Sequence, residues 1–161
     1  MTTFTTLFKE EFRNLLKKKY KCNIKTEEVH YSQGKYRIIF DHYIDKQDQI
    51  ILIEHEFRRS DPITNLVKTI DWICHSQKFS KKKIRLIHIF DESYYGDPNN
   101  AYKKNITIFL YKRCIFLPKK LKYFKYIPIT IMGSTRSYKR KDEAFAKALA
   151  KSAYDQIVKR I

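Results

Sequence analysis

Two apolar segments separated by a short polar stretch constrain this chain most. Residues 35–45 read KYRIIFDHYID, residues 50–57 read IILIEHEF, and the polar residues 46–49 lie between them. Runs rich in Ile, Tyr and Phe on either side of a turn predict a β-hairpin. The run IILI does not alternate with polar residues, which is typical of a strand covered on both faces. We therefore expect this hairpin to lie inside a sheet flanked by helices.

The centre of the turn decides which side chains share a face of the hairpin. A turn centred between Gln47 and Asp48 pairs Asp45 with Ile50, Tyr43 with Leu52, and Asp41 with Glu54. Directly opposed residues point to the same face, and so do residues two apart on one strand. We therefore expect Asp41, Glu54 and Glu56 to converge on one face. The residues expected on the opposite face are Phe40, Ile51, Ile53 and Phe57.

Carboxylates gathered on an apolar hairpin need a positive counter-charge, because burying unpaired charges is costly. A hard divalent cation, Mg²⁺ or Mn²⁺, suits carboxylate oxygens. Glu11 falls within the inward stripe of a predicted first helix, and we expect it to reach the same cluster as a ligand or an orienting group. The expected metal ligands are Asp41, Glu54, Glu56 and Glu11. The alternative is that Asp41 and Glu54 pair with lysines on an exposed sheet face.

Periodicity predicts the remaining elements of an α/β fold. The elements expected up to residue 91 are a helix over 4–19, a strand over 27–32, the hairpin, a helix that begins at Pro62 and is capped by Ser60 or Asp61, and a strand over 83–90. The second helix carries the apolar stripe Ile63, Leu66, Val67, Ile70 and Ile73. Residues 101–132 are ambiguous and fit a helix followed by strands at 106–111 and 123–132. A last helix over 141–160 directs Phe145, Leu149, Ala153 and Ile157 inward.

The formal net charge of +17 favours polyanionic partners, with nucleic acid first and anionic membrane second. The basic residues come in clusters along the chain. The residues expected to contact nucleic acid are Arg58, Arg59, Lys81, Lys82, Lys83, Arg136, Lys139 and Arg140. The alternative is a solvated surface in a protein from a lysine-rich proteome, because charged runs usually lie in water.

Length and composition indicate one domain, over residues 1–161. The first residues, MTTFTTLFKEEF, lack the pattern of a signal peptide, and no apolar run approaches the roughly 20 residues that span a bilayer. The three cysteines, Cys22, Cys74 and Cys114, are scattered and odd in number, which fits a reducing compartment. We therefore expect a cytoplasmic protein that does not enter a membrane.

The residues of the hairpin resemble the signature of the PD-(D/E)xK nuclease superfamily, which has the restriction-endonuclease-like fold. That family has an αβββαβ core, an Asp on the second strand and (D/E)-x-K on the third. Asp41 matches the first acid, Ile53-Glu54-His55-Glu56 matches the second element, and Glu11 matches a helical Glu of many members. The resemblance covers residues 4–91 as the core and leaves 92–161 as a C-terminal extension with further strands and a helix.

The chain departs from the family pattern because Glu56 occupies the position of the lysine, so the motif reads ExE. Some members of the family carry the lysine on the following helix. Lys68 is our first choice for that migrated lysine and Arg58 the second. An ordinary surface lysine is an equal alternative for Lys68.

The resemblance implies a metal-dependent nuclease that hydrolyses phosphodiester bonds in DNA, with Asp41, Glu54, Glu56 and Lys68 as catalytic residues. The sequence does not separate DNA from RNA, and cleavage of both strands would call for a homodimer. One alternative is a non-catalytic nucleic-acid-binding or scaffold protein on the same fold. Another is a structural protein whose charge reflects its genome. A zinc site of His42 and His55 with Cys74 or His75 lacks the ligand spacing of zinc modules.

Overall fold

A computed structural model describes residues 3–22, 24–31, 36–57, 61–75, 82–114, 119–133 and 142–161. Within them the elements are α1 (Phe4–Tyr20), β1 (Lys25–Tyr31), β2 (Tyr36–Asp45), β3 (Gln49–Glu56), α2 (Ile63–His75), β4 (Lys83–Asp91), α3 (Glu92–Tyr95), α4 (Pro98–Cys114), η2 (Lys119–Tyr123), β5 (Phe124–Ile131) and α6 (Glu143–Val158). The expected helix and strand order up to residue 91 is confirmed.

The strands form one mixed sheet in the order β1-β2-β3-β4-β5. β1, β2 and β3 are antiparallel neighbours, whereas β3, β4 and β5 run parallel to one another. The two parallel connections contain helices, as parallel crossovers require. β3 lies in the middle of the sheet, and this explains why its apolar run is buried.

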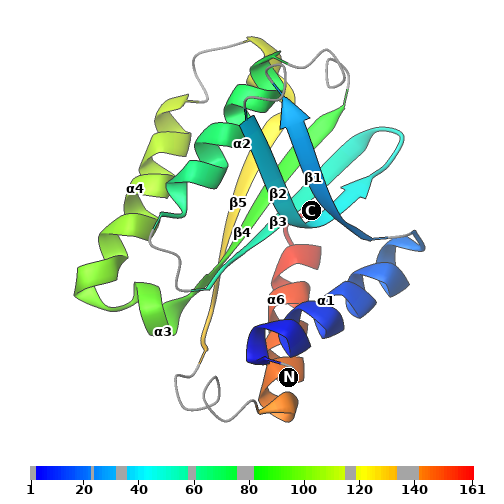
Figure 1. The fold of residues 1–161 in the computed structure, drawn as a ribbon, viewed down its shortest axis with the longest axis vertical. Helices are drawn as coiled ribbons and strands as arrows, with labels where there is room; N and C mark the ends of the chain where they lie inside the picture. The colour runs from blue at the N-terminus through cyan, green and yellow to red at the C-terminus, as the bar shows by residue number, and fades with distance from the viewer. Residues whose placement is uncertain are drawn as a thin grey trace.

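Helices cover both faces of the sheet (Figure 1). α1 and α6 pack on one face over a core that includes Phe8, Phe12 and Ile53. α2 covers the other face over a second core that includes Leu66 and Trp72, with residues of α4 packed against it. The expectation of an α/β fold with a mixed sheet flanked by helices is therefore confirmed.

The first and last helices begin where a side chain caps them. The Thr3 hydroxyl accepts a hydrogen bond from Thr6 N at 3.2 Å, and the Asp142 carboxylate accepts one from Phe145 N at 2.9 Å. Phe145 is only partly buried, but the other residues expected to face inward on α6 are buried: Leu149, Ala153 and Ile157. On α2 the predicted stripe is wrong at Val67, whose side chain is 51% exposed.

The hairpin register is confirmed near the turn and changes farther along β2. Tyr43 pairs with Leu52 and Asp45 with Ile50, as expected. Against β1, however, Lys25 pairs with Tyr43 and Glu27 with Phe40, so two steps on β1 span three on β2. The extra residue is a β-bulge, which reverses the faces of the residues beyond it. Phe40 therefore packs in the α2-side core, and the prediction that it shares a face with Ile51 and Ile53 is wrong.

Residues 106–111 are helical, so the strand predicted there is wrong. They belong to α4, which begins at Pro98 after Asp97. The Asp97 carboxylate accepts a hydrogen bond from Asn99 N at 2.8 Å, and its carbonyl accepts one from Ala101 N at 2.8 Å. A capped first turn and packing against the sheet override the β propensity of Ile and Thr. The strand predicted over 123–132 is confirmed as β5.

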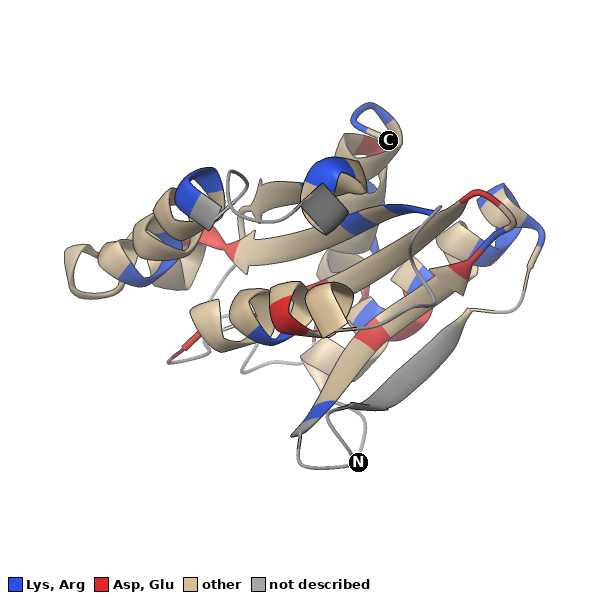
Figure 2. Cartoon of the chain, turned by 90° about the horizontal axis from the view of Figure 1, so that it is seen from above, with Lys and Arg blue, Asp and Glu red and all other residues tan. Residues whose placement is uncertain are grey.

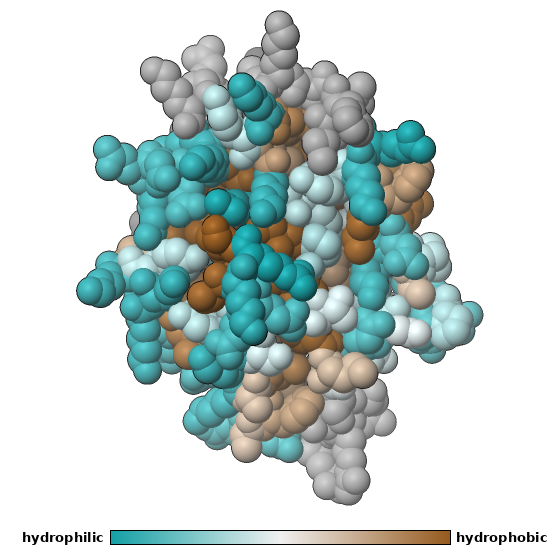
Figure 3. All heavy atoms as spheres, turned by 180° about the vertical axis from the view of Figure 1, so that it is seen from behind, coloured by the Kyte–Doolittle hydropathy of each residue, from teal (hydrophilic) through white to brown (hydrophobic). Residues whose placement is uncertain are grey.

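Lysine and arginine are distributed over several helices and strand ends (Figure 2). Seen from behind, hydrophilic side chains cover much of the surface, and hydrophobic atoms show between them (Figure 3). Among the described residues, no helix has the length and apolar character needed to span a membrane.

Candidate functional site

The candidate site is a group of buried polar side chains between the sheet and α2. Glu54, Glu56 and His88 are each 0% exposed. Glu54 and Glu56 lie two residues apart on β3 and so project from the same face. His88 is the register partner of Glu54 on the parallel neighbour β4. The sheet therefore brings two carboxylates and an imidazole together near the carboxyl ends of its central strands.

Glu56 connects β3 to α2. Its Oε1 accepts a hydrogen bond from Asn65 Nδ2 at 3.1 Å, and the same oxygen lies 3.9 Å from His88 Nδ1. Asn65 is in the first turns of α2, where the chain returns to the sheet after β3. A buried polar group that keeps a hydrogen-bond partner avoids the cost of desolvation, so this contact helps to hold the Glu56 carboxyl group in place.

Tyr126 of β5 extends the polar group to a third strand. Its hydroxyl lies 3.3 Å from His88 Nδ1. Burial, followed by the negative charge of Glu56 and the neighbouring Tyr95, raises the pKa of Tyr126 well above its usual value. The hydroxyl therefore stays protonated, and it donates a hydrogen bond to His88 Nδ1 in the tautomer that leaves this nitrogen without a proton.

Sequence reasoning missed His88 and Tyr126. The only signal for His88 is a histidine inside the apolar run KIRLIHIF, a position more often taken by an aliphatic residue. Tyr126 carries no signal, because its place beside His88 depends on the parallel pairing of β4 with β5.

Lys68 lies on the side of α2 that carries Asn65 and Trp72. It follows Asn65 by three residues and precedes Trp72 by four, so the three share one helix face. Asn65 contacts Glu56 and Trp72 contacts Phe40, with ring centroids 5.8 Å apart. Lys68 is half-buried and has no hydrogen bond or ion pair to the described part of the chain. The alternative candidate, Arg58, lies outside the described residues.

Asp41 lies apart from the two glutamates. It is next to the bulge in β2, on the side of the sheet that α1 covers. Its carboxylate forms an ion pair with Lys9 of α1 and accepts a hydrogen bond from His55 N at 2.9 Å. The convergence of Asp41 with Glu54 and Glu56 is therefore not found. The physical reason is the extra residue in β2, which turns Asp41 toward the backbone of β3.

Glu11 faces α6. The carboxylate of Glu143 and, more weakly, that of Glu11 raise the pKa of Lys147 on α6. The expectation that Glu11 reaches the β3 carboxylates finds no support in these contacts.

The two hairpin histidines do approach each other, but a zinc site with Cys74 or His75 is wrong. The rings of His42 and His55 are 4.9 Å apart, and both pack against Phe12 of α1. Cys74 packs in the core on the opposite face of the sheet, and His75 is exposed beside Asp71. Burial lowers the pKa of His42 to about 3, which keeps this ring neutral.

Only two of the residues expected to bind nucleic acid are described. Lys82 forms an ion pair with Asp45 and donates to the Lys46 carbonyl at 2.9 Å, and Lys83 is exposed. The others lie outside the described residues: Arg58, Arg59, Lys81, Arg136, Lys139 and Arg140.

Within the described ranges, no group of three or more His, Cys, Asp or Glu side chains is placed to hold a metal ion. Mg²⁺, however, is often bound through one or two carboxylates, with water and substrate phosphate as further ligands. Glu54 and Glu56 supply two carboxylates that are fully buried on one face. The pair could supply at most two of the ligands of such a cation, and it does not form a cage made by the protein alone.

Comparison with protein-family models, curated proteins and solved structures finds no match for this chain.

Proposed function

We propose that this chain is a divalent-metal-dependent nuclease of restriction-endonuclease-like fold that hydrolyses phosphodiester bonds in DNA. The observation that carries the proposal is the buried pair Glu54 and Glu56 facing the Asn65 and Lys68 side of α2. An antiparallel β1-β2-β3 unit, a helix and a parallel β4 also agree with the core that the resemblance implies. The formal charge of +17 suits a polyanionic substrate.

In this proposal Glu54 and Glu56 would hold Mg²⁺ or Mn²⁺ on the α2 side of β3. The cation would lower the pKa of a water molecule and offset charge on the scissile phosphate. Asn65 orients the Glu56 carboxylate through its hydrogen bond. Lys68 neutralises the charge that develops on the phosphate, which is the role of the migrated lysine. Asp41 acts as a positioning residue, because it holds the β3 backbone between the two glutamates.

The test is cleavage of plasmid DNA by the wild type and by Glu54→Gln, with Mn²⁺ binding followed by isothermal titration calorimetry on the same samples. We expect metal binding and cleavage to disappear together in Glu54→Gln, since the amide keeps the shape but not the charge. Glu143→Gln is the matched control, because Glu143 lies on α6 in an exposed pair with Lys147. A wild type that binds no metal and cuts no DNA would rule the proposal out.

A non-catalytic nucleic-acid-binding or scaffold protein is the second candidate. The ion pair of Asp41 with Lys9 favours it, because the acid that the resemblance assigns to the metal is paired with a lysine instead. Such a protein would bind DNA in a salt-dependent manner and have no cleavage activity to lose.

A further inference from the structure

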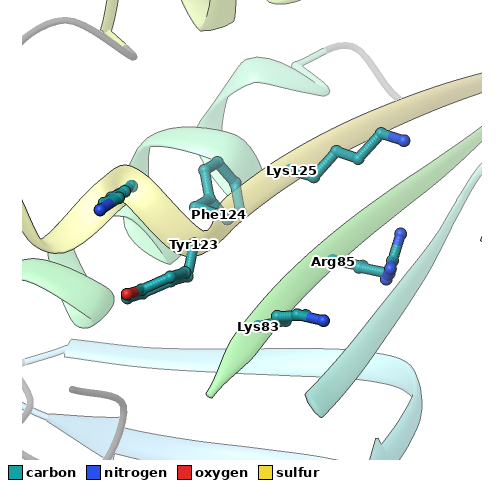
Figure 4. Close-up of a pocket in the computed structure, with 6 residues that line it drawn as sticks. Lys83, Arg85, Tyr123, Phe124 and Lys125 are labelled. Atoms are coloured by element: carbon teal, nitrogen blue, oxygen red, sulfur yellow. The ribbon is translucent and has the colours of Figure 1, made fainter. Parts of the chain in front are cut away.

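A basic pocket of about 380 Å³ lies at the amino ends of β4 and β5, the end of these strands remote from Glu56. The lining consists of Lys83, Arg85, Lys122, Tyr123, Phe124 and Lys125 (Figure 4). Four of these six residues are cationic and none is acidic. The lining thus combines positive charge with two aromatic rings.

The floor of the pocket is the part of the sheet where the helical cover ends. Arg85 and Lys125 are register partners on β4 and β5 and project from one face of the sheet (Figure 4). Two residues farther along, the same face carries Ile87 and Ile127, which belong to the core under α1 and α6. The face changes from aliphatic to cationic where the core stops, and this leaves the cations open to a ligand.

Placing like charges opposite each other on neighbouring strands costs stability. Arg85 and Lys125 form such a pair, with Lys83 two residues before Arg85 on the same face. Arg85 is held by a hydrogen bond from its Nε to Gln49 Oε1 at 3.3 Å. An anionic ligand would remove the repulsion, since phosphate oxygens accept hydrogen bonds from guanidinium and ammonium groups.

Tyr123 adds a surface for stacking. Its side chain is 47% exposed, and Lys122 Nζ lies 5.7 Å from the centre of its ring. An exposed ring beside cations is the combination that binds single-stranded nucleic acid, where the phosphates meet the charges and an unpaired base stacks on the ring. A duplex does not offer such a base, and a flat membrane surface does not fill a pocket.

We propose that this pocket binds single-stranded nucleic acid, with Lys83, Arg85 and Lys125 on the phosphates and Tyr123 stacked on a base. The site does not depend on the proposed hydrolysis, because it lies at the other end of β4 from the buried carboxylates. It would hold a strand whether or not the protein cuts it.

The test is fluorescence anisotropy of a labelled oligothymidylate with the full chain in EDTA, so that no metal-dependent cleavage interferes. The variant Lys83→Gln/Lys125→Gln is compared with the control Lys104→Gln/Lys147→Gln, which removes the same charge from helices outside the lining. We expect the pocket variant to bind about tenfold more weakly than the control. A plot of log affinity against log salt concentration should become shallower by about 1.4 for the pocket variant, since each phosphate contact on a single strand contributes roughly 0.7 to this slope. Equal weakening in both would overturn the proposal.

The aromatic contact is tested separately. Tyr123→Ala should weaken binding about tenfold, whereas Tyr123→Phe should keep it, because stacking needs the ring and not the hydroxyl. The single-strand assignment would be contradicted if duplex DNA bound as tightly as the oligonucleotide and lost the same factor of affinity in Tyr123→Ala. Binding to phosphatidylserine vesicles serves as the comparison. If Lys83→Gln/Lys125→Gln loses vesicle binding but keeps oligonucleotide binding, the pocket is a membrane site and the single-strand assignment is wrong. Both double variants should have unfolding temperatures within a few degrees of the wild type. Misfolding is then excluded as the cause of weaker binding.

Discussion

Asn65 of α2 donates a hydrogen bond from its side-chain amide to Glu56 Oε1 on β3, over 3.1 Å. This contact joins the helix that carries Lys68 to the strand that carries both buried glutamates. It places the two parts of the proposed active site next to each other across the α2 face of the sheet.

We expect Asn65→Ala to lower the free energy of unfolding by about 1.5–3 kcal/mol, because it removes a hydrogen bond to the buried Glu56 carboxyl group, a contact that is strongest when the acceptor is ionised. Urea denaturation measures this loss. In the Glu56→Gln background the same replacement should cost less, since the acceptor is then neutral. Asn105→Ala is the control, because Asn105 is exposed on α4. An equal loss in the two backgrounds would show that the charge of Glu56 does not contribute.

Asp41→Asn and Asp41→Ala separate the two contacts of Asp41. The amide of Asn still accepts from His55 N but loses the ion pair with Lys9, which costs at most about 1 kcal/mol for a partly exposed pair. Ala removes the acceptor as well, and a buried donor without this partner costs about 1–3 kcal/mol.

Amide hydrogen exchange at His55 distinguishes the two Asp41 variants directly. Protection of this N–H should persist in Asp41→Asn and be lost in Asp41→Ala. Protection that is unchanged in Asp41→Ala would mean that Asp41 does not hold the bulge of β2.

The parts of the site that follow from local rules were predictable, and the parts that depend on distant pairings were not. The register of Tyr43 with Leu52 follows from the turn between β2 and β3, which is adjacent in sequence. The bulge at Asp41 depends on pairing with β1 and on the hydrogen bond to His55, and neither has a local signal. A one-residue irregularity was enough to move Asp41 away from the face of Glu54.

His88 and Tyr126 show the same limit. Their positions beside Glu54 and Glu56 come from the parallel register of β3, β4 and β5, whose strands are connected through helices. Because helices and not tight turns join these strands, side-chain packing sets their register. The strand predicted over 106–111 is wrong for the opposite reason. Its β propensity is a local signal, and the capped helix α4 overrides it.

His42 makes the free energy of unfolding depend on pH. Burial lowers its pKa in the folded state to about 3, and the positive charges of Arg13 and Lys9 act in the same direction while Asp41 opposes them. The unfolded chain, with a histidine pKa near 6.5, binds the proton first as the pH falls, so stability decreases from about pH 6.5 toward pH 3. Between pH 7 and pH 5 this contribution amounts to about 2 kcal/mol.

Urea denaturation at pH 7 and pH 5 checks this dependence. His42→Leu should lose less stability between the two values than the wild type, by about 2 kcal/mol. His75→Leu, at an exposed position of α2, removes a histidine without disturbing the core. If both variants reduce the acid sensitivity equally, His42 is not its source.

Lys68 is the residue on which the proposed chemistry depends most. A fixed cation beside a phosphate contributes to the transition state far more than to binding, because the charge on the phosphate grows during the reaction. We therefore expect Lys68→Ala to reduce the rate of DNA cleavage about 10²–10³-fold and to leave DNA affinity within a factor of about three. Single-turnover cleavage of a labelled duplex, with binding measured by anisotropy in EDTA, separates the two quantities.

Lys104→Ala is the matched control, since Lys104 pairs with Glu92 on the neighbouring α3 and does not face β3. Lys68→Arg should retain part of the rate, because the charge is kept while the shape changes. A Lys68→Ala variant that cleaves like the wild type would assign the role to another cation. Equal loss of rate and affinity would make Lys68 a binding residue, since only a group that acts in the transition state changes the rate without changing the affinity.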